Sequence, residues 1–123
     1  MSLSEYFSVE RTNDVLVVVL GRRLDSFAGP GLLTERTAFL DEIRDARVAA
    51  VLVDFDDVEY FDSMLLDTLC RAWRHLRERK ATMALCNLHD GSEEIIRKCR
   101  LDSLWPVYPS RESAIEALRP KGT

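Results

Sequence analysis

Apolar residues follow two different periods along the chain, and these periods predict strands and helices in turn. Runs of β-branched and aromatic residues at 6–10 and 15–20 flank a polar RTND segment, which is typical of a hairpin turn. Residues 48–53 (VAAVLV) are apolar at every position, as expected of a strand that is covered on both faces. Residues 81–86 form another such run, and 107–108 indicate a short last strand.

Helical spacing of apolar residues fills the segments between these strands. A first helix is expected over 30–46, with a proline suited to its first turn. A second, amphipathic helix is expected over 63–79, and a short third helix over 91–100. Ser110 is expected to cap a final helix that ends near Leu118.

This order of elements predicts the fold class. Strands that are separated by single helices require parallel neighbours joined by right-handed connections, whereas the first two strands form a hairpin. We therefore expect an α/β fold with a mixed central sheet, parallel crossovers and about four helices. The length of 123 residues is typical of one compact domain. A single domain over 1–123 is expected, with 119–123 as a flexible tail.

Charge and cysteine content narrow the class of protein. The net charge of -4 provides no basic field for a polyphosphate, so nucleic acid is not an expected partner. The chain has three widely spaced cysteines and no CxxC motif, which argues against a disulfide framework or a structural zinc site; they are Cys70, Cys86 and Cys99. His75 and His89 lack partners at metal-ligand spacing. Without a leader pattern or an apolar run of about 18 residues, a cytoplasmic protein without a membrane span is expected.

A cluster of carboxylates precedes one serine in the middle of the chain. Its members are Asp54, Asp56, Asp57, Glu59 and Asp62, and the serine is Ser63. Because the strand ends near 53 and the helix begins near 63, we expect the hydroxyl at the carboxyl edge of the sheet, where partners dock. Two alternatives remain open: Ser63 caps the helix, or Asp62 caps it and Ser63 lies one step inside.

The residues around this serine resemble a known family. The run VLVDFDDVEYFDSMLLDTLCRAWRHLRERKATMALCNL is similar to the signature of STAS domains, named for sulfate transporters and anti-sigma-factor antagonists. The upstream GRRLDSFAGPGL resembles the loop before the family's first helix, and EEIIRKCRLDSLWPVYPSRESAIEAL resembles its closing elements. The resemblance covers nearly the whole chain and implies a STAS-like fold.

The resemblance also implies a regulated protein-binding function. In anti-sigma-factor antagonists, the serine of the Asp-Ser pair is phosphorylated by a partner that is both kinase and anti-sigma factor. Only the unmodified form binds that partner. By position, Ser63 is the expected phosphorylation site in partner-switching signalling and transcription regulation. The expected partner-binding residues are Asp25, Ser26, Asp54, Asp57, Asp62, Met64 and Leu65.

One departure from the family pattern keeps a second function open. Phosphorylated members commonly read Asp-Ser-Ser-Gly-Leu, whereas this chain reads DSMLL from residue 62, and leucine keeps another backbone further away than glycine does. An exposed Met64 and Leu65 would then form a dry contact. The alternative is a STAS-type accessory subunit of a lipid or anion transport complex, with Ser63 only as a helix cap. Its constant interface would include 24–31. A homodimer is also left open.

Enzymes with an aspartate after a buried strand were the remaining alternative. Asp54 and Asp56 are similarly placed to the acids of haloacid-dehalogenase phosphatases and response-regulator receivers, which bind a metal. A receiver needs an acidic pair where this chain has Gly21, Arg22 and Arg23, and a dehalogenase needs a longer chain. We therefore expect no enzyme, no catalytic residue, no metal and no cofactor, since the partner kinase would bring ATP and magnesium.

Overall fold

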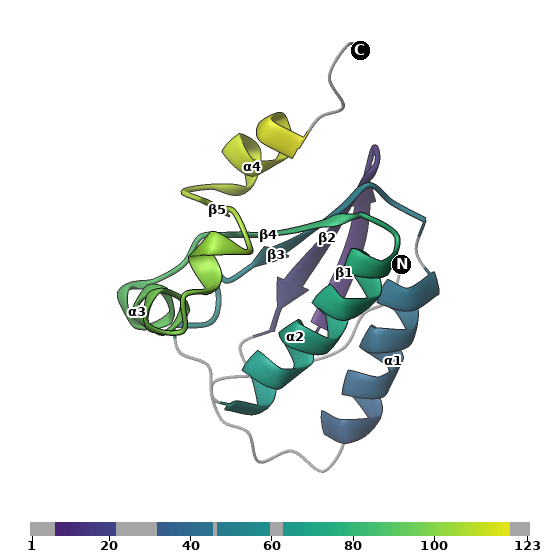
Figure 1. The fold of residues 1–123 in the computed structure, drawn as a ribbon, viewed down its shortest axis with the longest axis horizontal. Helices are drawn as coiled ribbons and strands as arrows, with labels where there is room; N and C mark the ends of the chain where they lie inside the picture. Colours follow the sequence, from purple (N-terminus) through teal and green to yellow (C-terminus); the bar gives the residue numbers. More distant parts are fainter. Residues whose placement is uncertain (1–6, 22–31, 46, 60–62, 119–123) are drawn as a thin grey trace.

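The computed structural model describes residues 7–21, 32–45, 47–59 and 63–118 (Figure 1). Within these ranges lie four α-helices and five strands, in the predicted order. The elements are β1 (Phe7–Thr12), β2 (Val15–Leu20), α1 (Leu32–Asp45), β3 (Ala50–Asp54), α2 (Ser63–Glu78), β4 (Thr82–Cys86), α3 (Asp90–Lys98), the 3-10 helix η2 (Leu101–Ser103), β5 (Val107–Tyr108) and α4 (Arg111–Leu118).

The sheet is mixed, as predicted. Its strand order is β1-β2-β3-β4-β5, with β1 antiparallel to β2 and every other neighbouring pair parallel. Asn13 makes the hairpin turn with a φ of 53°, a left-handed conformation that asparagine tolerates better than most residues. The predicted strand at 48–53 is shifted, because β3 begins at Ala50 and includes Asp54. The first acid of the cluster therefore belongs to the strand and not to the loop.

Alternate residues of the central strands pack against different helices. Val51 and Val53 of β3 face the larger core, which α1, α2 and α3 cover, whereas Ala50 and Leu52 face the smaller core beneath α4. Figure 1 shows α1 and α2 side by side on one side of the sheet and α4 apart from them. This alternation explains why β3 is apolar at both sets of positions, since both faces of the sheet are covered.

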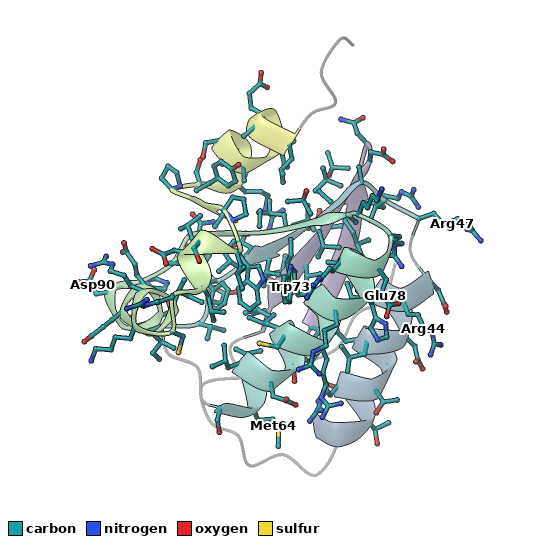
Figure 2. All side chains as sticks on the ribbon, in the orientation of Figure 1. Arg44, Arg47, Met64, Trp73, Glu78 and Asp90 are labelled. Atoms are coloured by element: carbon teal, nitrogen blue, oxygen red, sulfur yellow. The ribbon has the colours of Figure 1, made fainter. Side chains whose placement is uncertain are left out.

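Helix α2 buries one stripe of its surface against the sheet. The buried residues recur at helical spacing and are Leu65, Thr68, Leu69, Ala72 and Leu76. Burying one leucine side chain contributes about 1.5–3 kcal/mol, so these contacts fix the rotation of the helix about its axis. Trp73 lies at the edge of this stripe, with its ring 6.4 Å from that of Trp105 (Figure 2).

Side chains cap the beginning of α4 and the end of α1. Ser110 caps α4 as predicted, because the Ser113 N–H donates to Ser110 Oγ at 3.1 Å. At the C-terminus of α1, Arg79 donates from Nη1 to the carbonyl of Arg44 and from Nη2 to that of Ile43, both at 2.7 Å. A cation at this end of α1 also opposes the helix dipole. Arg79 thus has a structural role within a basic stretch of the sequence.

The carboxylate of Asp54 joins three elements at the carboxyl edge of the sheet. Arg111 of α4 donates to Asp54 Oδ2 from Nε at 3.1 Å and from Nη2 at 3.0 Å. Asn87, directly after β4, donates to Oδ1 at 3.0 Å, and the backbone N–H of Asp56 donates to the same oxygen at 2.9 Å. Arg111 also pairs with Glu10 of β1 at 3.3 Å. A buried charge is tolerated when it is paired and hydrogen-bonded in this way.

The three cysteines lie in different environments. Cys86 is buried, and this burial, reinforced by the nearby charge of Asp54, raises the pKa of its thiol to about 12. Cys70 is half-buried, and burial raises its pKa as well. Cys99 is exposed at the end of α3. Because the thiolate is the reactive form, burial and the raised pKa make Cys86 a poor nucleophile.

Replacing Arg111 with Met should lower the free energy of unfolding by about 2 kcal/mol, because a buried carboxylate would lose its cation. The loss should fall below that of a fully buried pair, since the Arg111 side chain is 31% exposed. As a control, Arg97→Met removes an exposed pair with Glu93 and should cost less than about 0.5 kcal/mol. Urea denaturation measures both losses, and equal losses would contradict the assigned role of Asp54.

Iodoacetamide at about pH 8 should modify the folded protein first at Cys99 and leave Cys86 unmodified until the chain is unfolded in urea. Intact mass spectrometry over time measures the number of modified thiols. The Cys99→Ser variant should lose the fast phase. Fast modification of Cys86 in the folded protein would show that its strand is more open than described.

Candidate functional site

The loop after β3 alternates buried apolar residues with exposed acids. Phe55 and Val58 are buried, and the N–H of Val58 donates to the carbonyl of Phe55 at 2.9 Å, which closes a tight turn. Asp56, Asp57 and Glu59 are exposed. The buried pair anchors the loop, so these three carboxylates face solvent at the carboxyl edge of the sheet.

Ser63 is the exposed first residue of α2. The first N–H groups of a helix lack partners inside the helix, and the helix dipole places partial positive charge there. A hydroxyl at this position is accessible to a second protein, and an anion attached to it would be stabilised by the helix. Asp62, Asp25 and Ser26 lie outside the described residues, so their predicted roles, including which residue caps α2, stay predictions.

Asp54 was expected in the loop, where it would contact the partner, but it lies at the end of β3 and is buried. It is 3% exposed, and its carboxylate faces the chain itself, so Asp54 supports the loop from below. His89 also contacts the loop, because its Nε2 lies 2.8 Å from the carbonyl oxygen of Asp56. The sequence did not indicate this role of His89 or the contacts of Asn87 and Arg111 with Asp54. Only Asn87 carried a local signal, since it directly follows a predicted strand.

The expected exposure of Leu65 is wrong. Leu65 is 1% exposed and belongs to the larger core, together with Leu69 of the next turn. Leu65 occupies the position where the family pattern has glycine, and it points into the core. Met64 is only partly buried and lies at the beginning of α2 (Figure 2). Of these two residues, only Met64 is partly exposed, and its side chain also packs against the larger core.

An ion-pair group lies one helical turn after Ser63. Asp67 accepts from Arg71 Nε at 2.8 Å and from Arg36 Nη2 of α1 at 3.1 Å. The hydrogen bond from Arg71 lowers the pKa of Asp67 below its usual value; burial opposes this shift, and the charges of Arg71, Arg36 and Arg74 add to it. Two cations therefore offset the charge of Asp67. The local negative field near Ser63 comes instead from the exposed loop acids.

Two further properties bear on the class of site. Among residues 7–21, 32–45, 47–59 and 63–118, no group of three or more His, Cys, Asp or Glu side chains is arranged to hold a metal ion. In the same part of the chain, every helix is too short or too polar to cross a membrane.

Comparisons with known proteins agree with this geometry. The family model described as STAS domain matches residues 6–114. An anti-sigma-factor antagonist (STAS) domain protein from Planctomyces limnophilus has a similar structure, with a TM-score of 0.81 and 23% sequence identity, over 95% of this chain and 100% of that one. A comparison with curated proteins finds no match.

Two structures of SpoIIAA are also similar. The anti-sigma factor antagonist SpoIIAA in its unphosphorylated form has a TM-score of 0.73 and 18% identity, over 92% of this chain and 96% of that one. The Bacillus cell fate determinant SpoIIAA in the phosphorylated form has a TM-score of 0.67 and 18% identity, over 92% and 99%. The expected STAS-like α/β fold is confirmed. The chain belongs to the STAS domain family.

Proposed function

We propose that this chain is a non-enzymatic anti-sigma-factor antagonist whose protein binding is controlled by phosphorylation of Ser63. The observation that carries the proposal is that Ser63 is exposed as the first residue of α2; in sequence it follows the exposed acids Asp56, Asp57 and Glu59. The partner is a protein that acts as serine kinase and anti-sigma factor. It transfers the γ-phosphoryl group of its ATP to the Ser63 hydroxyl in the cytoplasm.

Electrostatics supports such a switch. A phosphate adds a charge of about -1.5 to -2 at neutral pH, and the amino end of α2 partly compensates it. The fold therefore tolerates the modification. We propose that the partner presents carboxylates or an apolar patch to the unmodified hydroxyl, so that the phosphate adds like-charge contact or desolvation, which costs several kcal/mol. A loss of about 2.7 kcal/mol already weakens binding 100-fold.

The described residues narrow the proposed contact surface. Ser63, Met64 and Asp57 lie at the surface and are proposed to contact the partner directly. Asp54 is proposed to act indirectly, through its hydrogen bond to the backbone of Asp56. Asp62, Asp25 and Ser26 stay part of the proposal on the family resemblance alone.

The alternative is an accessory subunit of a lipid or anion transport complex with a constant interface. Leu65 was expected to contact the partner in both functions, and it packs in the core. The other expected segment of the constant interface, 24–31, lies outside the described residues. The two functions differ in whether the charge at position 63 controls binding.

Charge at position 63 should control affinity for a serine kinase of the partner-switching type from the same organism. We expect Ser63→Asp to bind at least about 100-fold more weakly than the natural protein and Ser63→Ala to bind within about threefold of it, as measured by calorimetry. Ser103→Asp places the same charge on another exposed serine and should change affinity little. Equal affinities of Ser63→Asp and Ser63→Ala would remove the proposal.

Incubation with this kinase and ATP should add the mass of one phosphoryl group, because Ser63 is the single proposed acceptor. Intact mass and peptide mapping should locate the group on Ser63. The Ser63→Ala variant should remain unmodified, and Ser103→Ala should be modified like the natural protein. Modification of Ser63→Ala to the same extent would place the acceptor elsewhere.

A further inference from the structure

Arg36 bridges α1 and α2 close to the proposed phosphorylation site. Its Nη2 donates to Asp67 Oδ2 at 3.1 Å, and its side chain is only 18% exposed. The same oxygen of Asp67 accepts from Arg71 Nε at 2.8 Å. Asp67 therefore has two cationic partners on one oxygen, and it would keep the shorter hydrogen bond if Arg36 moved away.

Asp67 and Ser63 are neighbours on the surface of α2. Residues four apart on a helix face the same side, with Cβ atoms about 5–6 Å apart, and both residues are exposed. A phosphate on Ser63 reaches further from the helix than the hydroxyl, so it would enter the space beside Asp67. A guanidinium has five N–H donors, and within the described part of the chain Arg36 uses one of them in a hydrogen bond. The planar fork of a guanidinium can bind more than one acceptor oxygen at a time.

We propose that Arg36 is the intramolecular receptor of a phosphate on Ser63: its guanidinium shifts from Asp67 to the phosphoserine, while Arg71 keeps Asp67. This inference rests on the proposed phosphorylation of Ser63. Arg36 acts as a positioning residue, since it holds the phosphate against the α1–α2 pair and contacts no reacting atom. The exchange makes and breaks ion pairs only, so no covalent bond changes.

The chemistry of the two acceptors favours this exchange. A phosphoserine carries nearly twice the charge of a carboxylate at neutral pH and offers three acceptor oxygens. Arginine binds phosphate with two parallel hydrogen bonds, and such charge-assisted pairs are stronger than neutral ones. Asp67 remains neutralised by Arg71, so the move of Arg36 leaves no carboxylate without a cation. The phosphate is thereby fixed at the surface and presented in one orientation.

The test is a phosphorus-31 NMR pH titration of protein in which phosphoserine is incorporated at position 63 during translation. A cation at the phosphate stabilises the dianion, so the second pKa of this phosphoserine should lie below the usual value of about 6. Arg36→Gln should raise this pKa by about 0.5–1 unit. Arg74→Gln removes a cation that lies three helical turns from Ser63 and should change it by less than about 0.2 unit.

A double-mutant cycle tests the competition between the two acceptors. Asp67→Asn removes the rival carboxylate, so the effect of Arg36→Gln should be larger in that background than in the natural protein. Arg36→Lys should keep part of the lowered pKa, because the charge remains without the planar fork; it also serves as the test if Arg36→Gln does not fold. Identical titrations of the natural protein, Arg36→Gln and Arg36→Lys would overturn the proposal.

The phosphoserine titration tests the role of Arg36 independently of whether a kinase modifies Ser63. Phosphoserine enters without a kinase, so failure of the partner to modify Ser63 leaves the titration unchanged. Conversely, a normal switch in partner binding with no effect of Arg36 on the titration would reject only the role of Arg36.

Discussion

The buried carboxylate of Asp54 determines the shape of the edge where the proposed site lies. It accepts four hydrogen bonds, two from Arg111 and one each from Asn87 and the backbone of Asp56. These contacts join the end of β3, the segment after β4 and the beginning of α4. A charge in this position requires all of its partners, because an uncompensated buried ion is strongly unfavourable. The same bond to Asp56 sets the turn that exposes the loop acids.

At this edge of the sheet, the residues that hold the loop in place differ from those proposed to contact the partner. Asp54, Phe55 and Val58 face inward and hold the loop, whereas the exposed carboxylates and Ser63 face solvent. Leu65 fixes the rotation of α2 by packing in the core, and this rotation in turn sets the direction in which Ser63 and Met64 project. A regulatory phosphate at Ser63 can therefore change the surface without disturbing the packed interior, because Ser63 itself is exposed.

The sequence predicted the fold more completely than the site. Buried strands and amphipathic helices have strong periodic signals, so the order of elements and the mixed sheet were both correct. The exposure of Leu65 was wrong because Leu65 and Leu66 are both apolar, and periodicity alone does not fix the rotation of a helix by one residue. Arg111 and Arg36 were missed because each acts on an acid far away in sequence, and such pairs leave no local pattern.

The central claim is that one hydroxyl at the amino end of α2 determines whether a partner binds. The most direct measurement compares the affinity of the Ser63-phosphorylated chain for its partner with that of the same sample after phosphatase treatment. We expect the phosphorylated form to bind at least about 100-fold more weakly and phosphatase treatment to restore the affinity in full. Equal affinity before and after removal of the phosphate would contradict the account.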